Sequence, residues 1–245
     1  MELNLIQHQK KKTMIPVKNK IFLVLFLISG CTNTQHHIGE QYLGKKYILS
    51  PLGEEKAPDT DPLIRSDAFD CTTFVETSLA KGDVNKLTKI RYKDGKIDFF
   101  NRNHFIESDW LYNNSDIVEN VSTQYGKTAI GNVIIDKKSW LKKMYNIDSN
   151  IAKQPVALEY IPYKYLTDIK IKKPLIVLFI SGNSKIYDKI GTDIAVVHMG
   201  FLLPGGILRH ASRIKKSVVD TDFEEYINKL KQNKNNIGIA LVKIK

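Results

Sequence analysis

The stretch Asp70-Cys71-Thr72-Thr73-Phe74-Val75-Glu76 decides the fold that we expect for this chain. Aspartate is a good N-cap, so it predicts a helix that begins at Cys71, runs to about Ala80 and stops at Gly82. Cys71 is then the first helical residue, where the helix dipole favours a thiolate and free backbone amides can hold an oxyanion. One cysteine at a helix start, with histidines far downstream, is the pattern of a thiol nucleophile.

Two distant histidines can supply the base that such a thiol needs. His198 is a polar residue in the apolar strand predicted for 194–203, and His210 lies in the strand expected after the turn Pro204-Gly205-Gly206. Because side chains alternate along a strand, a loop with an odd number of residues puts both histidines on one face. A three-residue Leu203-Pro204-Gly205 loop would make them direct cross-strand neighbours, and a two-residue loop would put them on opposite faces.

Composition and strand pattern indicate a globular α+β protein. The 245 residues are 42% hydrophobic and 26% charged, which is typical of a folded domain and not of a disordered chain. A mostly antiparallel sheet is predicted from apolar runs at 173–180, 194–203, 207–212, 218–219 and 237–244. A helix is expected near 223–230. We expect the stretch 82–172 to add helices and loops, with 155–165 irregular, and we see no second domain.

The beginning of the chain resembles the leader of a bacterial lipoprotein. A basic segment precedes a continuous apolar run at 21–28, which is too short to span a bilayer. The ending Ile28-Ser29-Gly30-Cys31 resembles a lipobox, whose cysteine becomes the lipidated first residue. An ordinary cleaved signal or an uncleaved anchor would also fit this leader, and Met14 could serve as the start instead of Met1.

This leader predicts the organisation and location of the protein. We expect a signal peptide at 1–30, a tether at 31–41 and a single catalytic domain at 42–245. Lipid on Cys31 would hold the protein at a membrane, and Thr32 in the next position favours the outer membrane, facing the periplasm. A lipidated Cys31 cannot form a disulfide, so the other cysteine would remain a free thiol.

The net charge of the chain indicates which classes of partner to expect. The formal net charge is +11, and basic surfaces attract nucleic acid, anionic lipid or an acidic polymer. The lysines are dispersed and are not interleaved with aromatic residues in a binding motif. We therefore expect no nucleic-acid partner, and we expect a monomer.

Zinc binding competes with nucleophilic chemistry as a reading of these residues. Cys71, His198 and His210 are three residues of types that bind zinc, which takes three or four protein ligands. Close ligand pairs such as CxxC or HExxH do not occur in the sequence. We therefore expect neither a metal nor another cofactor.

Five short motifs follow one another along the chain. They are 70–76, Arg91-Tyr92-Lys93-Asp94-Gly95, Asn103-His104-Phe105 with Asp109-Trp110, Val197-His198-Met199-Gly200-Phe201, and His210-Ala211-Ser212. Together they resemble the N-acetylmuramoyl-L-alanine amidase-like family, which belongs to the NlpC-type papain-like cell-wall hydrolases. The resemblance covers about Leu43 to the C-terminus. It implies a cysteine peptidase fold and cleavage of amide bonds in peptidoglycan stem peptides.

The resemblance also implies roles for individual residues. Cys71 would be the nucleophile, His198 the general base and His210 the residue that orients the base. Tyr47 lies where such enzymes often have Gly-x-Pro-Tyr and would help to hold the oxyanion, although Lys46 replaces the expected proline. The lining of the substrate site is expected to include Arg102, His104, Asp109 and Trp110.

Several functions are compatible with these residues. The first is an amidase that cuts between muramic acid and L-alanine, with peptidoglycan or muropeptides as its partner. The second is an endopeptidase that cuts between D-glutamate and the diamino acid of the stem peptide, and it needs the same catalytic residues. The third is a non-catalytic envelope or peptidoglycan-binding lipoprotein, and the fourth is an acyl transferase that uses the same thioester.

Overall fold

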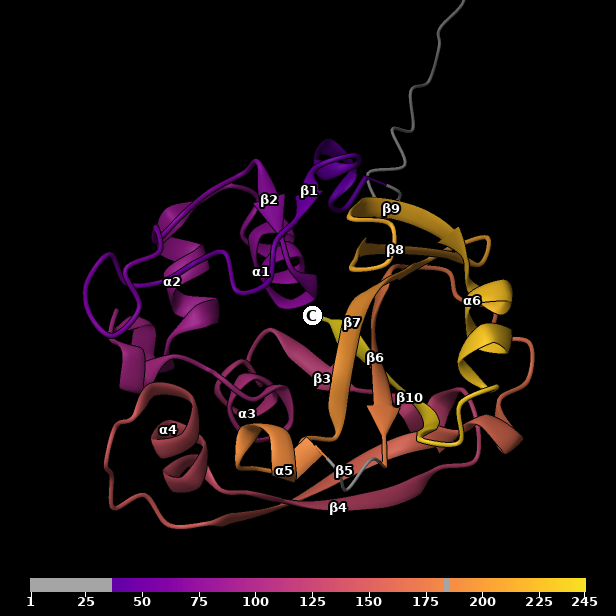
Figure 1. The fold of residues 1–245 in the computed structure, drawn as a ribbon. Helices are drawn as coiled ribbons and strands as arrows, with labels where there is room; N and C mark the ends of the chain where they lie inside the picture. Colours follow the sequence, from indigo (N-terminus) through magenta and orange to yellow (C-terminus); the bar gives the residue numbers. More distant parts are fainter. Residues whose placement is uncertain (1–36, 183–185) are drawn as a thin grey trace, which may run out of the picture. The chain divides into compact units, whose positions relative to one another are not determined.

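A ten-stranded sheet runs through the residues that the structure describes, 37–182 and 186–245, in the computed structural model (Figure 1). Neighbouring strands, in order, are β2 (Ala68–Phe69), β1 (Lys46–Tyr47), β9 (Ser217–Asp222), β8 (Ile207–Ser212), β7 (Val196–Leu203), β6 (Leu175–Ser181), β10 (Asn236–Ile244), β5 (Gln154–Pro162) and β4 (Ala129–Ile135). The strand β3 (Val118–Asn120) also pairs with β10. Of these pairings only β1–β2 is parallel, so the prediction of a mostly antiparallel sheet is confirmed.

The helices are short and lie on both faces of the sheet. They are α1 (Cys71–Ala80), α2 (Val84–Arg91), α3 (Leu111–Asn113), α4 (Lys137–Tyr145), α5 (Ile186–Ile190) and α6 (Phe223–Leu230). Single turns of 3₁₀ helix occur at η2 (Glu40–Tyr42), η3 (Lys93–Gly95), η4 (Phe99–Asn101), η6 (Ser122–Gln124) and η7 (Tyr163–Tyr165), and a π-helical turn, η5, spans Ile106–Trp110. Within the described residues every helix is too short or too polar to cross a bilayer.

The leader predictions cannot be compared with this structure. The signal peptide at 1–30, the lipid-bearing Cys31 and the tether as far as residue 36 lie outside the described residues. They therefore stay predictions.

The segment 82–172 differs from the prediction. It contains β3, β4 and β5, whereas we expected helices and loops there, and the segment expected to be irregular, 155–165, falls largely within β5. Proline cannot donate to a strand ladder and therefore disfavours a strand assignment. Here Pro155 and Pro162 lie at the two ends of β5, where they leave the central pairing with β4 intact.

The helix α1 begins and ends as the sequence predicts. Asp70 is its N-cap, with Oδ1 accepting a hydrogen bond from the Thr73 amide at 2.8 Å, and Thr73 Oγ1 accepts from the Asp70 amide at 3.0 Å. This reciprocal pair is a capping box. Lys81, in the left-handed conformation with φ 53°, ends the helix just before Gly82.

Two apolar layers hold the sheet between α1 and α6. On the α1 side Phe74 packs edge-on against Phe201 of β7, with ring centroids 5.7 Å apart. On the other side Ile227 of α6 belongs to a separate cluster with Phe179 of β6. Each layer buries aromatic and aliphatic surface, which is the main stabilising contribution to such a fold.

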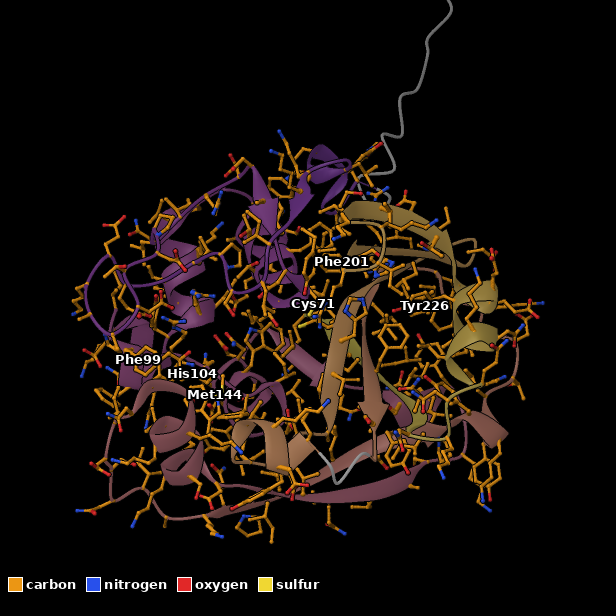
Figure 2. All side chains as sticks on the ribbon, in the orientation of Figure 1. Cys71, Phe99, His104, Met144, Phe201 and Tyr226 are labelled. Atoms are coloured by element: carbon orange, nitrogen blue, oxygen red, sulfur yellow. The ribbon has the colours of Figure 1, made fainter. Side chains whose placement is uncertain are left out.

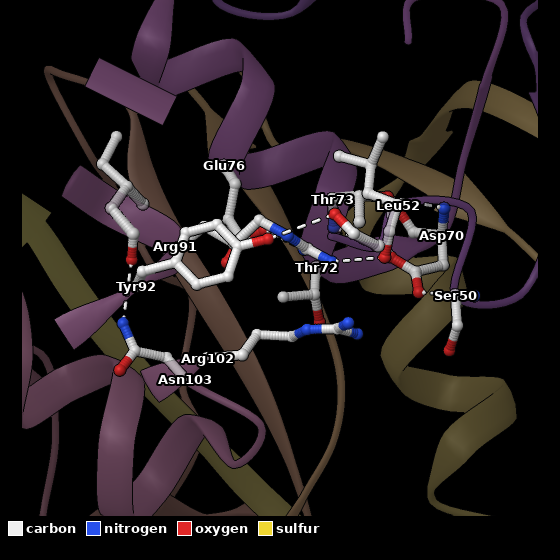
Figure 3. Close-up of polar contacts among 12 residues, drawn as sticks. Ser50, Leu52, Asp70, Thr72, Thr73, Glu76, Arg91, Tyr92, Arg102 and Asn103 are labelled. Atoms are coloured by element: carbon white, nitrogen blue, oxygen red, sulfur yellow. Dashed lines mark hydrogen bonds and ion pairs between the residues drawn. The ribbon is translucent and has the colours of Figure 1, made fainter. Parts of the chain in front are cut away.

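A buried ion pair ties α1 to α2 (Figure 3). Arg91 Nη1 donates to Glu76 Oε2 at 2.8 Å, and Arg91 Nη2 donates to the Leu52 carbonyl at 2.6 Å. The neighbouring Tyr92 hydroxyl donates to Glu54 Oε1 at 3.0 Å. Two of the motif segments, 70–76 and 91–95, therefore meet through buried polar contacts that hold the loop around Leu52.

We predict that Arg91→Met lowers the free energy of unfolding by about 3–5 kcal/mol, because Glu76 is left buried without its partner. The double variant Glu76→Leu/Arg91→Met should recover most of this loss, since it removes both charges. Urea unfolding followed by circular dichroism measures both. A loss below about 1 kcal/mol for Arg91→Met would contradict a structural role for the pair.

Candidate active site

The cysteine thiol lies where α1 meets β7. Cys71 is partly exposed, and its Sγ is 4.0 Å from Thr72 Oγ1. The backbone of Met199, the residue after His198, lies close enough to the thiol to lower its pKa. Cys71 therefore lies against the strand that carries the predicted base.

Backbone amides at the start of α1 remain available beside the thiol. The capping box uses the amides of Asp70 and Thr73, and the Phe74 amide donates to the Asp70 carbonyl. Within the described residues, the amides of Cys71 and Thr72 have no carbonyl or carboxylate acceptor. Unpaired amides at a helix start are suited to hold a developing oxyanion.

The thiol is neutral in the resting protein. Burial, and next the Asp70 carboxylate, raise the pKa of Cys71 to about 12, while hydrogen bonds from Met199 and Thr72 act in the opposite direction. This shift is the reverse of the one that we expected from the helix dipole. A thiol in this state could attack a substrate only after a base removes its proton.

The turn between β7 and β8 brings the two histidines to one face. The loop has three residues, Pro204–Gly206, and pairs Leu203 with Ile207 and Phe201 with Arg209. This is the odd-length case, in which both histidines lie on one face. The loop lies one residue later than the Leu203–Gly205 loop that would pair the histidines directly, so His210 falls opposite Gly200 and diagonal to His198.

Gly200 makes this diagonal contact possible. A Cβ at this position would lie 2.8 Å from both the Arg209 carbonyl oxygen and the His210 Cβ. Without it, the imidazoles meet edge to face, with His198 Nε2 at 2.6 Å from His210 Nδ1. His210 Nε2 lies 3.5 Å from Thr221 Oγ1.

The hydrogen-bond pattern leaves His198 Nδ1 as the basic nitrogen. If His210 Nε2 donates to Thr221, His210 Nδ1 must accept from His198 Nε2, and the lone pair of His198 then lies on Nδ1. Among the described residues, no hydrogen bond joins His198 to Cys71. Catalytic hydrogen bonds are often long in the resting state and shorten when substrate binds.

Both imidazoles are neutral near neutral pH. Burial, and then the neighbouring His210, lower the pKa of His198 to about 3. Burial also lowers the pKa of His210 to about 4, against the raising effect of Asp220. Between these pKa values and that of Cys71, the imidazoles are therefore unprotonated while the thiol keeps its proton.

Tyr226 of α6 belongs to the site, although the sequence did not single it out. Its ring centroid lies 5.1 Å from that of His210 and 6.2 Å from that of His198. Burial and the proximity of Cys71 raise the pKa of its phenol to about 12. Figure 2 shows Cys71 near the middle of the view and Tyr226 to its right, between β7 and α6. In the sequence Tyr226 is one residue of the helix expected near 223–230.

Tyr47 lies beside the thiol. It is half-buried on β1, and burial, followed by the proximity of Cys71 and Asp70, raises the pKa of its hydroxyl to about 12, while Arg213 acts in the opposite direction. The structure thus brings together Tyr47, Cys71 and the histidine strand.

The remaining predicted lining residues take part in contacts within the protein. Arg102 donates from Nε to Glu54 Oε1 at 2.7 Å and from Nη2 to Asp59 Oδ2 at 2.8 Å. His104 Nε2 contacts the Phe99 carbonyl at 2.7 Å, and burial lowers its pKa to about 3. Both side chains are therefore occupied by neighbours in this structure.

Asp109 and Trp110 lie on η5. Asp109 Oδ1 accepts a hydrogen bond from Lys137 Nζ at 2.6 Å, and Trp110 is fully buried with no acceptor for its indole N–H among the described residues. Asp109, Arg102 and Lys137 line one hollow of about 210 Å³. The structure groups these residues around that hollow, whereas the thiol site gathers around β7.

Comparison with known proteins identifies relatives of this fold. Residues 37–237 match the family described as AmiA-like, N-acetylmuramoyl-L-alanine amidase-like. A solved protein of the family DUF1460 from Legionella pneumophila is 24% identical, with a TM-score of 0.79 over 86% of this chain and 88% of its own. An N-acetylmuramoyl-L-alanine amidase from Bacteroides uniformis is 24% identical, with a TM-score of 0.67 over 87% of this chain and 98% of its own.

A third solved structure carries a different name. A Bacteroides fragilis protein, whose assignment as a xylanase is provisional, is 26% identical, with a TM-score of 0.64 over 84% of this chain and 99% of its own. No curated protein matches the chain. The matched region contains Cys71, His198 and His210.

We predict that iodoacetamide alkylates Cys71 slowly at pH 7 and about tenfold faster for each pH unit above it, because only the thiolate reacts. Asp70→Asn should accelerate the reaction at pH 8, since asparagine keeps the N-cap but removes the charge that raises the pKa of Cys71. The rate is measured by mass spectrometry in a Cys31→Ser background. Fast alkylation that does not change between pH 5 and 9 would show a standing thiolate instead.

We also predict that Tyr226→Leu lowers kcat by about 10²-fold, because the ring that packs against both imidazoles is lost and the base is misplaced. Tyr226→Phe keeps the ring and is the matched control, with an expected effect of a few-fold. Steady-state kinetics on muropeptides compares them. Equal losses in both variants would assign the effect to the hydroxyl.

Proposed function

The chain belongs to the N-acetylmuramoyl-L-alanine amidase-like family, and we propose that it is a cysteine-dependent amidase that cuts between muramic acid and L-alanine. One observation carries this proposal: the thiol at the start of α1 contacts the strand whose histidine is hydrogen-bonded to His210 at 2.6 Å. A helix-start thiol, a base on the facing sheet and a third residue that orients the base form the papain-like, NlpC-type arrangement.

The proposed reaction begins from a neutral thiol and a neutral imidazole. His198 Nδ1 takes the proton of Cys71 as Sγ forms a bond to the amide carbonyl carbon. The amides at the start of α1 and the Tyr47 hydroxyl stabilise the oxyanion. The C–N bond then breaks, and the leaving amine takes the proton from His198.

Water completes the turnover. His198 removes a proton from water as the water oxygen attacks the thioester carbonyl, and the C–S bond breaks. The proton returns to Cys71, so the thiol is regenerated. His210 keeps the imidazole in the tautomer that each step needs, and Thr221 and the Tyr226 ring hold His210 in place.

Other reactions at the same site would need different substrates or different catalytic groups. An endopeptidase that cuts after D-glutamate would use the same thiol and base, and it differs only in which amide is bound. Glycoside hydrolysis needs two free carboxyl groups around the scissile bond. The Asp70 carboxylate beside Cys71 is already bonded to the amides of Thr73 and Ser50. The neutral imidazole pair beside the thiol supports amide chemistry instead.

We further propose that the mature protein is a lipoprotein of the bacterial envelope, attached through lipid on Cys31. The apolar run at 21–28 and the following lipobox support this proposal. A membrane-bound amidase would act on peptidoglycan from the periplasmic side.

We predict that Cys71→Ala lowers kcat on muropeptides by at least about 10⁴-fold, and that His198→Ala has a comparable effect, because the two act as one unit. Cys31→Ser is the matched control and should keep full activity in detergent extracts. Mass spectrometry of the digest identifies the bond, since an amidase releases a peptide that begins with L-alanine. Full activity in Cys71→Ala would refute the proposal.

A further inference from the structure

Five exposed cations border Tyr47, and we refer to them as the basic rim. The basic rim comprises Lys45, Lys46, Arg213, Lys215 and Lys216. In the described part of the chain none of them forms an ion pair. Asp67 lies near Lys46, but its two oxygens are already bound by Arg65 at 2.9 and 2.7 Å. The rim therefore has positive charge without an internal partner among the described residues.

The backbone makes the basic rim continuous. The Tyr47 amide donates to the Lys216 carbonyl at 2.9 Å, and the Val218 amide donates to the Lys45 carbonyl at 2.8 Å. In the same ladder Lys46 pairs with Ser217. The β1 segment and the turn 213–216 between β8 and β9 thus lie side by side, although they are far apart in the sequence.

The turn that presents three of these cations is itself ordered by hydrogen bonds. Ser212 Oγ accepts from the Lys215 amide at 3.1 Å, and Lys216 takes the left-handed conformation with φ 60°. A turn held in this way keeps the backbone that carries these cations in a fixed place relative to β1. This lowers the entropy cost of binding an anion there.

Tyr47 connects the basic rim with the nucleophile. Its hydroxyl lies within electrostatic range of both Cys71 and Arg213. An acyl group bound to Cys71 Sγ would therefore have the basic rim on the side where Tyr47 lies. Lys46 also stands where the resemblance led us to expect proline, so the charge belongs to this chain in particular.

We propose that the basic rim binds a free carboxylate of the substrate, so that the enzyme selects stem peptides with unblocked carboxyl groups over amidated ones. This inference rests on the proposed amidase function. Cations on a surface next to a reacting centre attract anionic ligands and fix their orientation. An anionic membrane is the competing partner, because Ile214 at the tip of the turn is 87% exposed. Because Tyr47 links the basic rim to the thiol, we favour the substrate over a membrane as the partner of the rim.

The test compares two muropeptides that differ only in whether their carboxyl groups are free or amidated. With the free form, Lys46→Glu/Arg213→Glu should raise KM by about tenfold, and the preference of the wild type for this form should shrink as salt is added. Lys86→Glu/Lys234→Glu makes the same change in net charge at exposed residues away from Tyr47, and it is expected to leave both KM values as they are.

Two outcomes would overturn the inference. One is equal kcat/KM of the wild type for free and amidated muropeptides. The other is a rim variant that loses binding to phosphatidylglycerol vesicles while its KM is unchanged. Calorimetric binding of the free muropeptide to Cys71→Ala, with and without the rim substitutions, separates this inference from the proposed function. If the wild type cuts neither muropeptide, a Kd that rises with the rim substitutions still supports this inference. A Kd that these substitutions leave unchanged still refutes it.

Discussion

The capping of α1 by Asp70 is the interaction on which the rest of the site depends. One carboxylate oxygen holds the Thr73 amide and hydroxyl, each at 2.8 Å, and the other accepts from the Ser50 amide at 3.0 Å. A single side chain thus fixes where the helix begins, where Cys71 points and where the chain after β1 runs. The same charge raises the pKa of Cys71 and Tyr47. The residue that positions the nucleophile therefore also keeps it protonated.

This constraint explains why the histidine pair is built as it is. A histidine can take the thiol proton only while it is neutral, and burial between β6, β8 and α6 keeps both imidazoles neutral. The close approach of β8 at Gly200 allows the hydrogen bond that orients His198. In the proposed reaction charge develops only during attack, next to helix amides and a tyrosine hydroxyl that are already in place. In the role proposed for it, the basic rim would add attraction for an anionic substrate outside this neutral centre.

The local features of the fold were predictable from the sequence, and its long-range features were not. The N-cap signal at Asp70 and the Pro204-Gly205-Gly206 turn are local, so α1 and the shared face of the histidines follow from them. The exact register between β7 and β8 depends on which three residues form the loop. Packing decides this, not the local sequence. The strand β5 has proline at its ends and β4 contains Gly131 and Asn132, so both look irregular until they pair. Tyr226 resembled a core residue because only the fold places α6 behind β7 and β8.

The central claim is that Cys71 becomes acylated by the muramoyl side of the substrate. Intact-mass spectrometry of the enzyme, acid-quenched during turnover of a defined muropeptide, tests it most directly. The account predicts a transient adduct on Cys71 with the mass of the sugar portion and its lactyl group, absent from Cys71→Ala. An adduct with the mass of a peptide fragment would move the cut to the stem peptide. Turnover by Cys71→Ala would contradict thiol catalysis altogether.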